Sequence, residues 1–163
     1  MSKVYVTSDW HLGHANAIKW REDFISQSHH DETILDNYMD VITKRDTVFF
    51  LGDIILGKDA EERKDIVEVM KSLPGRKHLI LGNHDLDRPH RGMLQLMRVF
   101  GDRIYSLHKY KGFWLSHAPI HPSELRGKRN IHGHVHSNTL DDNRYYNACL
   151  ENTDYKPKLI LEV

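Results

Sequence analysis

Short runs of apolar residues alternate with longer helical repeats over the first half of the chain. The runs at 3–8, 46–51 and 77–80 are rich in β-branched and aromatic residues, which predicts buried strands. Between them, apolar residues recur at helical spacing over 31–43 and 59–72, which predicts two helices. This order of strand, helix, strand, helix and strand is typical of a parallel or mixed α/β sheet.

The second half of the chain is richer in strands. One more helical repeat covers 89–99, and strand-like runs at 103–107 and 113–116 flank a turn-like segment, 109–112, which predicts a hairpin. Three further short runs lie at 130–132, 145–150 and 158–163. We therefore expect an α/β protein with a second sheet packed against the first, in a single domain that spans residues 1–163.

Composition narrows the class of protein. The chain has 163 residues, of which 39% are hydrophobic and 28% charged, as in a soluble globular domain. No apolar run approaches the roughly 20 residues of a membrane span, so we expect no membrane partner. The first residues enter a strand pattern at once, without the layout of a signal peptide, and a cytoplasmic location is expected.

The charge balance bears on the partners. Lysine plus arginine and aspartate plus glutamate both number 23, so the formal net charge is zero. Such a balance argues against a broad surface for nucleic acid, although it is compatible with a local basic patch. Arg126, Lys128 and Arg129 form one such cluster, either a solvated loop or a contact for phosphate or nucleic acid. Cys149 is the single cysteine, which excludes an internal disulfide, and its neighbours indicate a small buried residue.

Polar side chains that can bind metals or move protons follow the predicted strands. The clearest group, Gly82-Asn83-His84-Asp85, comes just after the strand at 77–80, and strand-end loops often carry functional groups. Asp9 and His11 follow the first strand, and in extended backbone two residues apart would point to the same side. The full set of such groups is Asp9, His11, Asp53, Asn83, His84, His117, His134 and His136.

These side chains form a mixed nitrogen and oxygen set without thiolates. Such ligands suit Mn, Fe, Zn, Ni or Mg, of which we expect manganese first. They are too many for one structural zinc, which takes four ligands, mostly Cys and His. A pair of divalent ions accommodates them, and Asp53, central in the order, is the natural bridging carboxylate.

The charge of such a pair predicts a class of substrate. Two divalent ions, two carboxylates and a bridging hydroxide leave roughly one net positive charge. A cationic centre with open positions favours an anionic oxygen substrate such as phosphate. Two ions roughly 3.5–4 Å apart can generate hydroxide at neutral pH and hold the oxygens of an in-line displacement.

Taken in order, these motifs resemble those of the calcineurin-like metallophosphoesterases. The matching blocks are Asp9-x-His11, Gly52-Asp53, Gly82-Asn83-His84-Asp85, His117 and Gly133-His134-x-His136. The resemblance runs from residue 4 to residue 150 and is greatest to the small bacterial and phage phosphoesterases that lack a cap domain. It implies a four-layer α/β/β/α sandwich of two mixed β-sheets flanked by helices.

The resemblance also implies a role for each residue. One metal would be held by Asp9, His11 and His136, the other by Asn83, His117 and His134, and both by Asp53. His84 would contact the phosphate and protonate the leaving oxygen, and Asp85 would orient His84.

Three functions are compatible with this pattern. The first is a dinuclear-metal-dependent phosphoesterase that cleaves phosphodiester or phosphomonoester bonds, with small nucleotide-type substrates expected. The second is a nuclease for short nucleic acids. The third, which we rank last, is a non-catalytic scaffold of the same fold, from which loss of His84 or of ligands would be expected. His14 and His121 are undecided between the site and a structural role.

Overall fold

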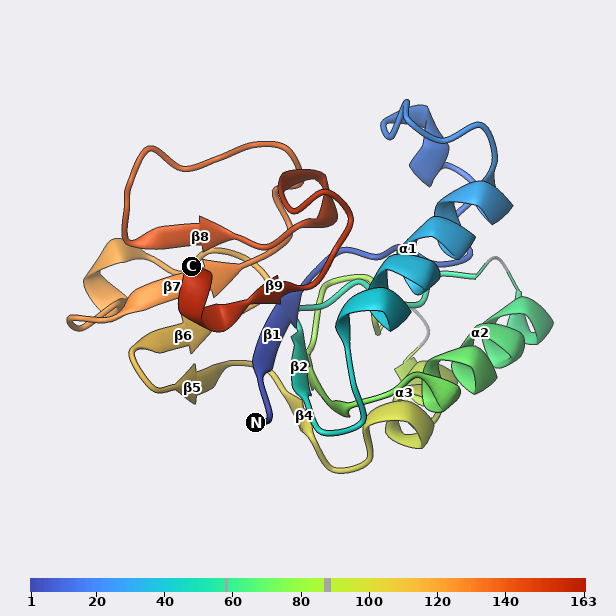
Figure 1. Cartoon of the computed structure of the whole chain (residues 1–163), viewed down its shortest axis with the longest axis horizontal. Helices are drawn as coiled ribbons and strands as arrows, with labels where there is room; N and C mark the ends of the chain where they lie inside the picture. The colour runs from blue at the N-terminus through green and yellow to red at the C-terminus, as the bar shows by residue number, and fades with distance from the viewer. Residues whose placement is uncertain (58, 87–88) are drawn as a thin grey trace.

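The computed structural model describes residues 1–57, 59–86 and 89–163, which form two β-sheets and three α-helices (Figure 1). The first sheet has the strand order β4-β3-β2-β1-β9 and the second the order β5-β6-β7-β8. The strands are β1 (Val4–Thr7), β2 (Thr47–Phe50), β3 (Arg76–Ile80), β4 (Ile104–Tyr105), β5 (His108–Tyr110), β6 (Phe113–Leu115), β7 (Arg129–His132), β8 (Tyr145–Asn147) and β9 (Lys158–Leu159). The helices are α1 (Gln27–Val41), α2 (Ala60–Ser72) and α3 (Pro89–Phe100), with 3₁₀ segments η1 (Ala17–Lys19), η2 (Pro122–Glu124), η3 (Leu150–Asn152) and η4 (Ile160–Glu162).

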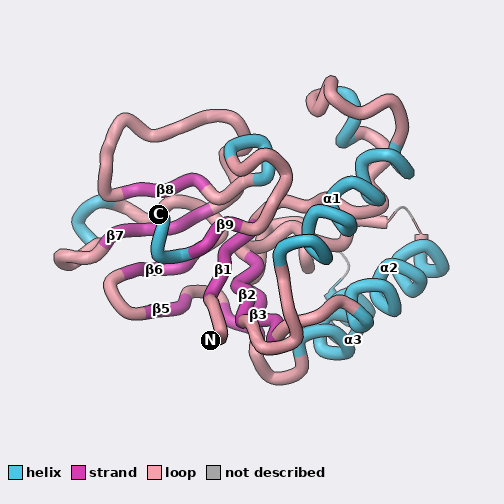
Figure 2. Tube along the Cα trace, in the orientation of Figure 1, coloured by secondary structure: helices cyan, strands magenta, loops and turns pink. Residues whose placement is uncertain are grey.

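The first sheet grows in one direction along the chain. Strands β1 to β4 are parallel, lie in chain order and are each joined to the next by a helix. Right-handed crossovers that all run the same way place every helix on one face of a sheet. The three helices accordingly cover one face, and the second sheet lies on the other (Figures 1 and 2).

Alternation along β2 divides the core into two layers. Val48 and Phe50 belong to the cluster that contains Ile34 and Met70 from the helices. Phe49, between them, belongs to the cluster that lies between the two sheets. Successive strand residues point to opposite faces, so a strand that is apolar throughout is one that is covered on both faces.

The predicted fold class of two mixed sheets flanked by helices is confirmed. In each sheet one pair is antiparallel, β1 with β9 and β5 with β6, and the other pairs are parallel. Residues 101–163 form no α-helix. The segment 118–128, which contains η2, contacts the outer face of the second sheet instead. Trp114 Nε1 on this outer face donates to Leu125 O at 3.1 Å.

The predicted hairpin is wrong in its first strand. Strand β5 pairs with β6 across a two-residue turn that contains Lys111 at φ 50°. The predicted turn covers 109–112, so most of β5 lies where the sequence predicts a turn. Strand β4 instead joins the first sheet beside β3. The second half of the chain therefore contributes strands to both sheets.

Helix α1 begins at Gln27 rather than at residue 31, because Ser26 Oγ accepts from His29 N at 3.1 Å and caps the helix. In the portion of the chain that the structure describes, no helix is both long and apolar enough to cross a membrane.

Candidate metal centre

The carboxyl ends of five strands meet at one edge of the two sheets. The loops after β1, β2, β3, β6 and β7 carry Asp9 and His11, Asp53, Asn83 to Asp85, His117, and His134 and His136. Parallel strands end on the same side of a sheet, and ligands of α/β proteins are usually bound there. The predicted site residues are thereby brought together from positions 9 to 136.

The backbone of these loops is left-handed at the predicted ligands. Asp9, His11 and Asp53 have φ of 56°, 53° and 56°, and His134 and His136 have φ of 72° and 50°. Such conformations cost roughly 1–3 kcal/mol each in a non-glycine residue and cluster at functional sites. The expectation of extended backbone at Asp9 and His11 is therefore wrong. Their N–H groups donate across to the loop after β2, each at 3.0 Å, and both side chains still reach the site.

Two glycines allow the loops to approach closely. A Cβ atom at Gly82 would collide with the carboxylate of Asp53, and one at Gly133 would collide with Ser8 Oγ and the carboxylate of Asp9. Each predicted carboxylate therefore packs against backbone that has no side chain, which explains why glycine precedes the ligands in these two blocks.

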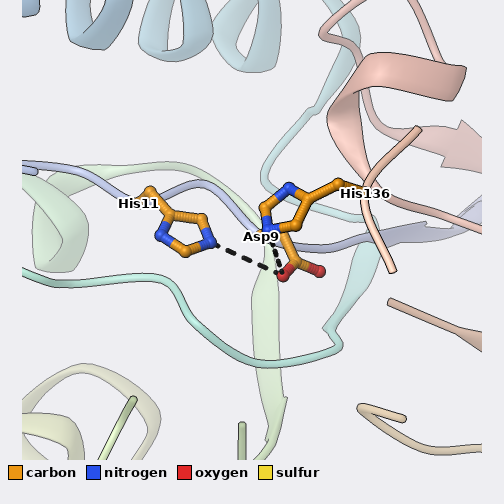
Figure 3. Close-up of side chains that lie close together, drawn as sticks. All are labelled: Asp9, His11 and His136. Carbon is orange, nitrogen blue, oxygen red and sulfur yellow. Dashed lines mark ion pairs between the residues drawn. The ribbon is translucent and has the colours of Figure 1, made fainter. Parts of the chain in front are cut away.

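Asp9, His11 and His136 form a group that we call the Asp9 cluster (Figure 3). His11 Nε2 lies 3.5 Å and His136 Nε2 3.9 Å from Asp9 Oδ1. Asp9 Oδ1 and both ring nitrogens of His11 are buried, and no described residue forms a hydrogen bond with them. Burial lowers the pKa of His11, which favours the neutral ring that binds metals. Unpaired buried polar atoms are costly, and a cation among them would satisfy all three residues.

The other oxygen of Asp9 is bonded within the protein. Oδ2 accepts from Ser8 Oγ at 2.6 Å, from His134 N at 2.9 Å and from Cys149 Sγ at 3.2 Å. Burial alone would raise the pKa of Asp9, but His11 and His117 and the hydrogen bonds from Ser8 and His134 lower it below its usual range. Asp9 thus keeps one oxygen fixed and directs the other at the cluster. Cys149 is buried as predicted, and it also holds this carboxylate.

Behind His136 lies a charged pair. Glu151 Oε1 accepts from His136 Nδ1 and from Arg21 Nε, both at 2.9 Å. A carboxylate only accepts, so Nδ1 carries a proton, and in the neutral ring the lone pair of Nε2 faces Asp9. Burial would raise the pKa of Glu151, but His136 and Arg21 lower it to about 2. The buried Arg21 also donates to the carbonyl oxygens of Asp9 and Trp10, and so supports the left-handed loop.

Asp53, Asn83, His117 and His134 form a second group, which we call the His117 cluster. His117 Nε2 lies 2.9 Å from Asn83 Oδ1, 3.2 Å from His134 Nδ1 and 3.3 Å from Asp53 Oδ2. His117 Nδ1 donates to Leu51 O at 2.7 Å, so Nε2 of the neutral ring has a lone pair. These converging acceptors can share either a proton or a metal ion.

At the His117 cluster a proton competes with a metal ion for Nε2 of His117. Burial would lower the pKa of His117, but the hydrogen bond with Asp53 and the charges of Asp53 and Asp9 raise it to about 9. Ligands of one ion lie roughly 3–3.5 Å apart when each is about 2.1 Å from it. The distances in the His117 cluster are close to this range, and those in the Asp9 cluster, 3.5 and 3.9 Å, lie at its upper end and above it. Ligand atoms of Asp9, Asp53 and His117 lie within 4.8 Å of one another, so the clusters adjoin.

His84 lies beside both clusters. Its backbone N donates to Asp53 Oδ1 at 2.9 Å, and its ring centroid lies 6.1 Å from that of His11. The residue is exposed. This is a position from which its ring can meet a substrate bound at the clusters.

Asp85 joins two of the loops. Its buried carboxylate accepts from the backbone N of Gly82, Asp53 and Ile54 at 2.7, 3.0 and 3.2 Å. These bonds tie the loop after β3 to the loop after β2 and so place Asp53. That Asp85 orients His84 stays a prediction.

The remaining sequence candidates divide between the site and the outer surface. The ring of His14 stacks on that of His11 with centroids 5.7 Å apart, so His14 borders the Asp9 cluster. His121 is exposed and caps η2, where its Nδ1 bonds with Ser123 Oγ at 2.8 Å. Arg126 is exposed and forms an ion pair within its own segment.

Arg21 and Glu151 were missed in the sequence analysis. They are 130 positions apart and belong to none of the strand-end blocks. A lone acidic residue directly after the apolar segment Ala148-Cys149-Leu150 is the only local sign of Glu151. Their support of the Asp9 cluster depends on contacts between distant segments, and no sequence pattern indicates such contacts.

Comparison with known proteins gives consistent relatives. A family model described as calcineurin-like phosphoesterase matches residues 2–163. The uncharacterized protein MJ1445 of Methanocaldococcus jannaschii is 33% identical over 168 residues, covering 96% of this chain and 86% of that protein. The gene 66 protein of Mycobacterium phage L5 is 33% identical, covering 84% and 79%. The crystal structure of AQ665, a protein of unknown function from Aquifex aeolicus, matches with a TM-score of 0.76 and 30% identity, covering 99% and 97%.

Proposed function

We propose, because the chain belongs to the calcineurin-like phosphoesterase family, that it hydrolyses phosphodiester or phosphomonoester bonds with two bound divalent metal ions. The Asp9 cluster would hold one ion and the His117 cluster the other, with Asp53 shared between them. Manganese is the first choice for this oxygen and nitrogen set, ahead of Fe, Zn, Ni or Mg. Small nucleotide-type phosphoesters are the proposed substrates.

One observation carries the proposal. Asp9 Oδ1 and His11 Nε2 are buried without a hydrogen-bond partner in the described chain, and they lie 3.5 Å apart beside a second ring nitrogen of fixed tautomer. A protein core does not leave such atoms unpaired without reason. A divalent cation is the simplest partner for a carboxylate oxygen and two imidazole lone pairs.

The residues around the clusters supply the rest of the chemistry. When bound, two such ions supply a Lewis acid and lower the pKa of water. His84, exposed beside both clusters, would contact the phosphoryl group and donate a proton to the leaving oxygen. Glu151 fixes the tautomer of His136, and Asp85 holds Asp53 in place through its backbone.

The test combines metal analysis with an assay. Purified protein loaded with Mn²⁺ is expected to bind two equivalents by calorimetry and to hydrolyse p-nitrophenyl phosphate, bis-p-nitrophenyl phosphate or both. Mg²⁺, Zn²⁺, Ni²⁺ and Fe²⁺ are compared in parallel. Absence of hydrolysis with every metal, together with no metal binding, would overturn the proposal in favour of a scaffold.

Short RNA and DNA oligonucleotides belong in the same panel. Cleavage of oligonucleotides at a higher kcat/KM than that of mononucleotide esters would replace the proposed substrate class with the nuclease alternative. The neutral net charge argues against that outcome, because nucleic-acid affinity depends mainly on neutralised phosphates.

A further inference from the structure

Trp20 is an exposed aromatic residue beside the Asp9 cluster. It follows η1, and 46% of its surface is exposed. Its ring centroid lies 5.4 Å from that of His14 and 6.4 Å from those of His11 and His136. The indole therefore forms the border of the candidate metal centre while much of its surface stays open to a ligand.

A cleft of about 690 Å³ is lined in part by Trp20. It runs between the loop 20–24, helix α1 and the segment 151–155, with Phe24 and Tyr155 among its lining residues. Glu151 also lines it and bonds to His136, so two residues link the cleft directly to the Asp9 cluster. Ligand sites for small molecules typically measure about 300–1,000 Å³.

The charges of the cleft restrict what it can bind. Glu22, Asp23 and Asp154 are exposed at its surface, whereas the carboxylate of Glu151 is paired with Arg21 and His136. The guanidinium of Arg21 is not available to bind a phosphate of the ligand, because its three nitrogens already bond with Glu151, backbone carbonyls and a buried imidazole. A group that carries further phosphates would be repelled by these carboxylates.

We infer that this cleft binds the alcohol part of the substrate, with a planar uncharged ring of the nucleoside type stacked on Trp20. This inference rests on the proposed function, because the reacting phosphate would lie at the two clusters. Thr33 and Asn37 also line the cleft, and they would offer acceptor oxygens to the sugar, because a donor of each already bonds with a backbone carbonyl. The substrate class is thus a nucleoside ester with a single phosphate, in preference to polyphosphates and to simple alkyl esters.

A matched pair of substrates tests the stacking contact. Thymidine p-nitrophenyl phosphate and methyl p-nitrophenyl phosphate share the same leaving group and differ in the nucleoside. We expect Trp20→Ala to lower kcat/KM for the thymidine ester roughly 5- to 150-fold more than kcat/KM for the methyl ester. Trp20→Phe is expected to keep most of the preference, and Leu140→Ala, which removes an exposed apolar side chain outside the cleft, all of it. Equal losses for both esters, or no loss for either, would overturn the inference.

Nucleoside binding gives a readout that does not depend on hydrolysis. Adenosine is expected to quench the fluorescence of the wild-type chain and of Trp114→Phe, but not that of Trp20→Phe. Quenching without hydrolysis of any ester would support the inference and overturn the proposed function. Hydrolysis of both esters at equal rates, without quenching, would support the function and overturn the inference.

Discussion

The Asp9 cluster and the His117 cluster adjoin one another but are built differently. In the Asp9 cluster the donor atoms stand 3.5 and 3.9 Å from Asp9 Oδ1, and Glu151 and Arg21 support them from outside. In the His117 cluster the neighbours lie 2.9 to 3.3 Å from one ring nitrogen, close enough to share its proton.

The two clusters should therefore lose their affinity for a cation under different conditions. Glu151 and Arg21 bond to His136 and to the backbone of Asp9, so the Asp9 cluster should respond to the loss of that support. In the His117 cluster a proton on Nε2 of His117 competes with a cation, so the metal affinity of this cluster should depend on pH. His84 belongs to neither cluster and should affect neither of these properties.

The largest expected effect is a loss of catalysis without a loss of bound metal. His84→Ala is expected to reduce kcat roughly 10²–10⁴-fold, the usual contribution of a general acid, with two metal equivalents still bound. Steady-state assays and calorimetry on the same sample measure both. A phosphoester whose leaving group needs no proton, such as one with p-nitrophenolate, should lose less activity than an alkyl ester. Equal loss for the two esters would count against a proton-donor role.

Asp53→Asn should affect both clusters together. Its Oδ2 faces His117 and its Oδ1 holds the loop of His84, so an amide in its place removes the shared charge and weakens the loop. Affinity for both ions is expected to fall more than the 10–100-fold typical of outer supporting residues. Metal titration followed by elemental analysis gives the occupancy. Two ions bound with unchanged affinity would exclude the bridging role.

Glu151→Gln should affect the Asp9 cluster alone. An amide can donate to His136 Nδ1 as well as accept, so the tautomer is no longer fixed, and one of the two ions should bind 10–100-fold more weakly. Calorimetry should then show one weakened and one unchanged site. Glu32→Gln, at an exposed position on α1, is the matched control and should change neither. Two equally weakened sites would mean that Glu151 supports the whole edge.

The smallest effect is a pH dependence of the His117 cluster. The pKa of His117 is raised to about 9, so below that pH a cation must displace a proton. Affinity for the second ion is expected to rise with pH, by up to about tenfold per unit between pH 7 and 9, and to level off above. Metal titrations at several pH values measure the slope. His117→Gln should abolish it, and a slope that survives in this variant would assign the proton elsewhere.

The fold was predictable where the pattern was local and long. Apolar runs such as 46–51 and helical repeats such as 59–72 correspond closely to β2 and α2. The hairpin failed because β4 is only two residues long and its partner, β3, lies across a helix. A short run of this kind is compatible with either sheet until the core forms around it.

The site was predictable as a set of residues but not as a geometry. Each candidate ligand could be selected because its side-chain type is unusual at a strand end, and the structure brings these side chains to one edge of the sheets. The left-handed backbone at Asp9 and Asp53 was not predictable, because two loops must pair before that conformation is held. Arg21 and Glu151 were invisible for the same reason, since a buried ion pair between distant positions has no spacing.

The family, the order of strands and helices, and the side chains that could bind a metal can be derived from the amino-acid sequence alone, since side-chain chemistry and hydrophobic period are local properties. The folded chain sets which oxygen of Asp9 stays free, which nitrogen of His136 faces it, and that Trp20 borders the centre. Those outcomes depend on directional contacts between loops far apart in the chain, and such contacts exist only once the two sheets have packed.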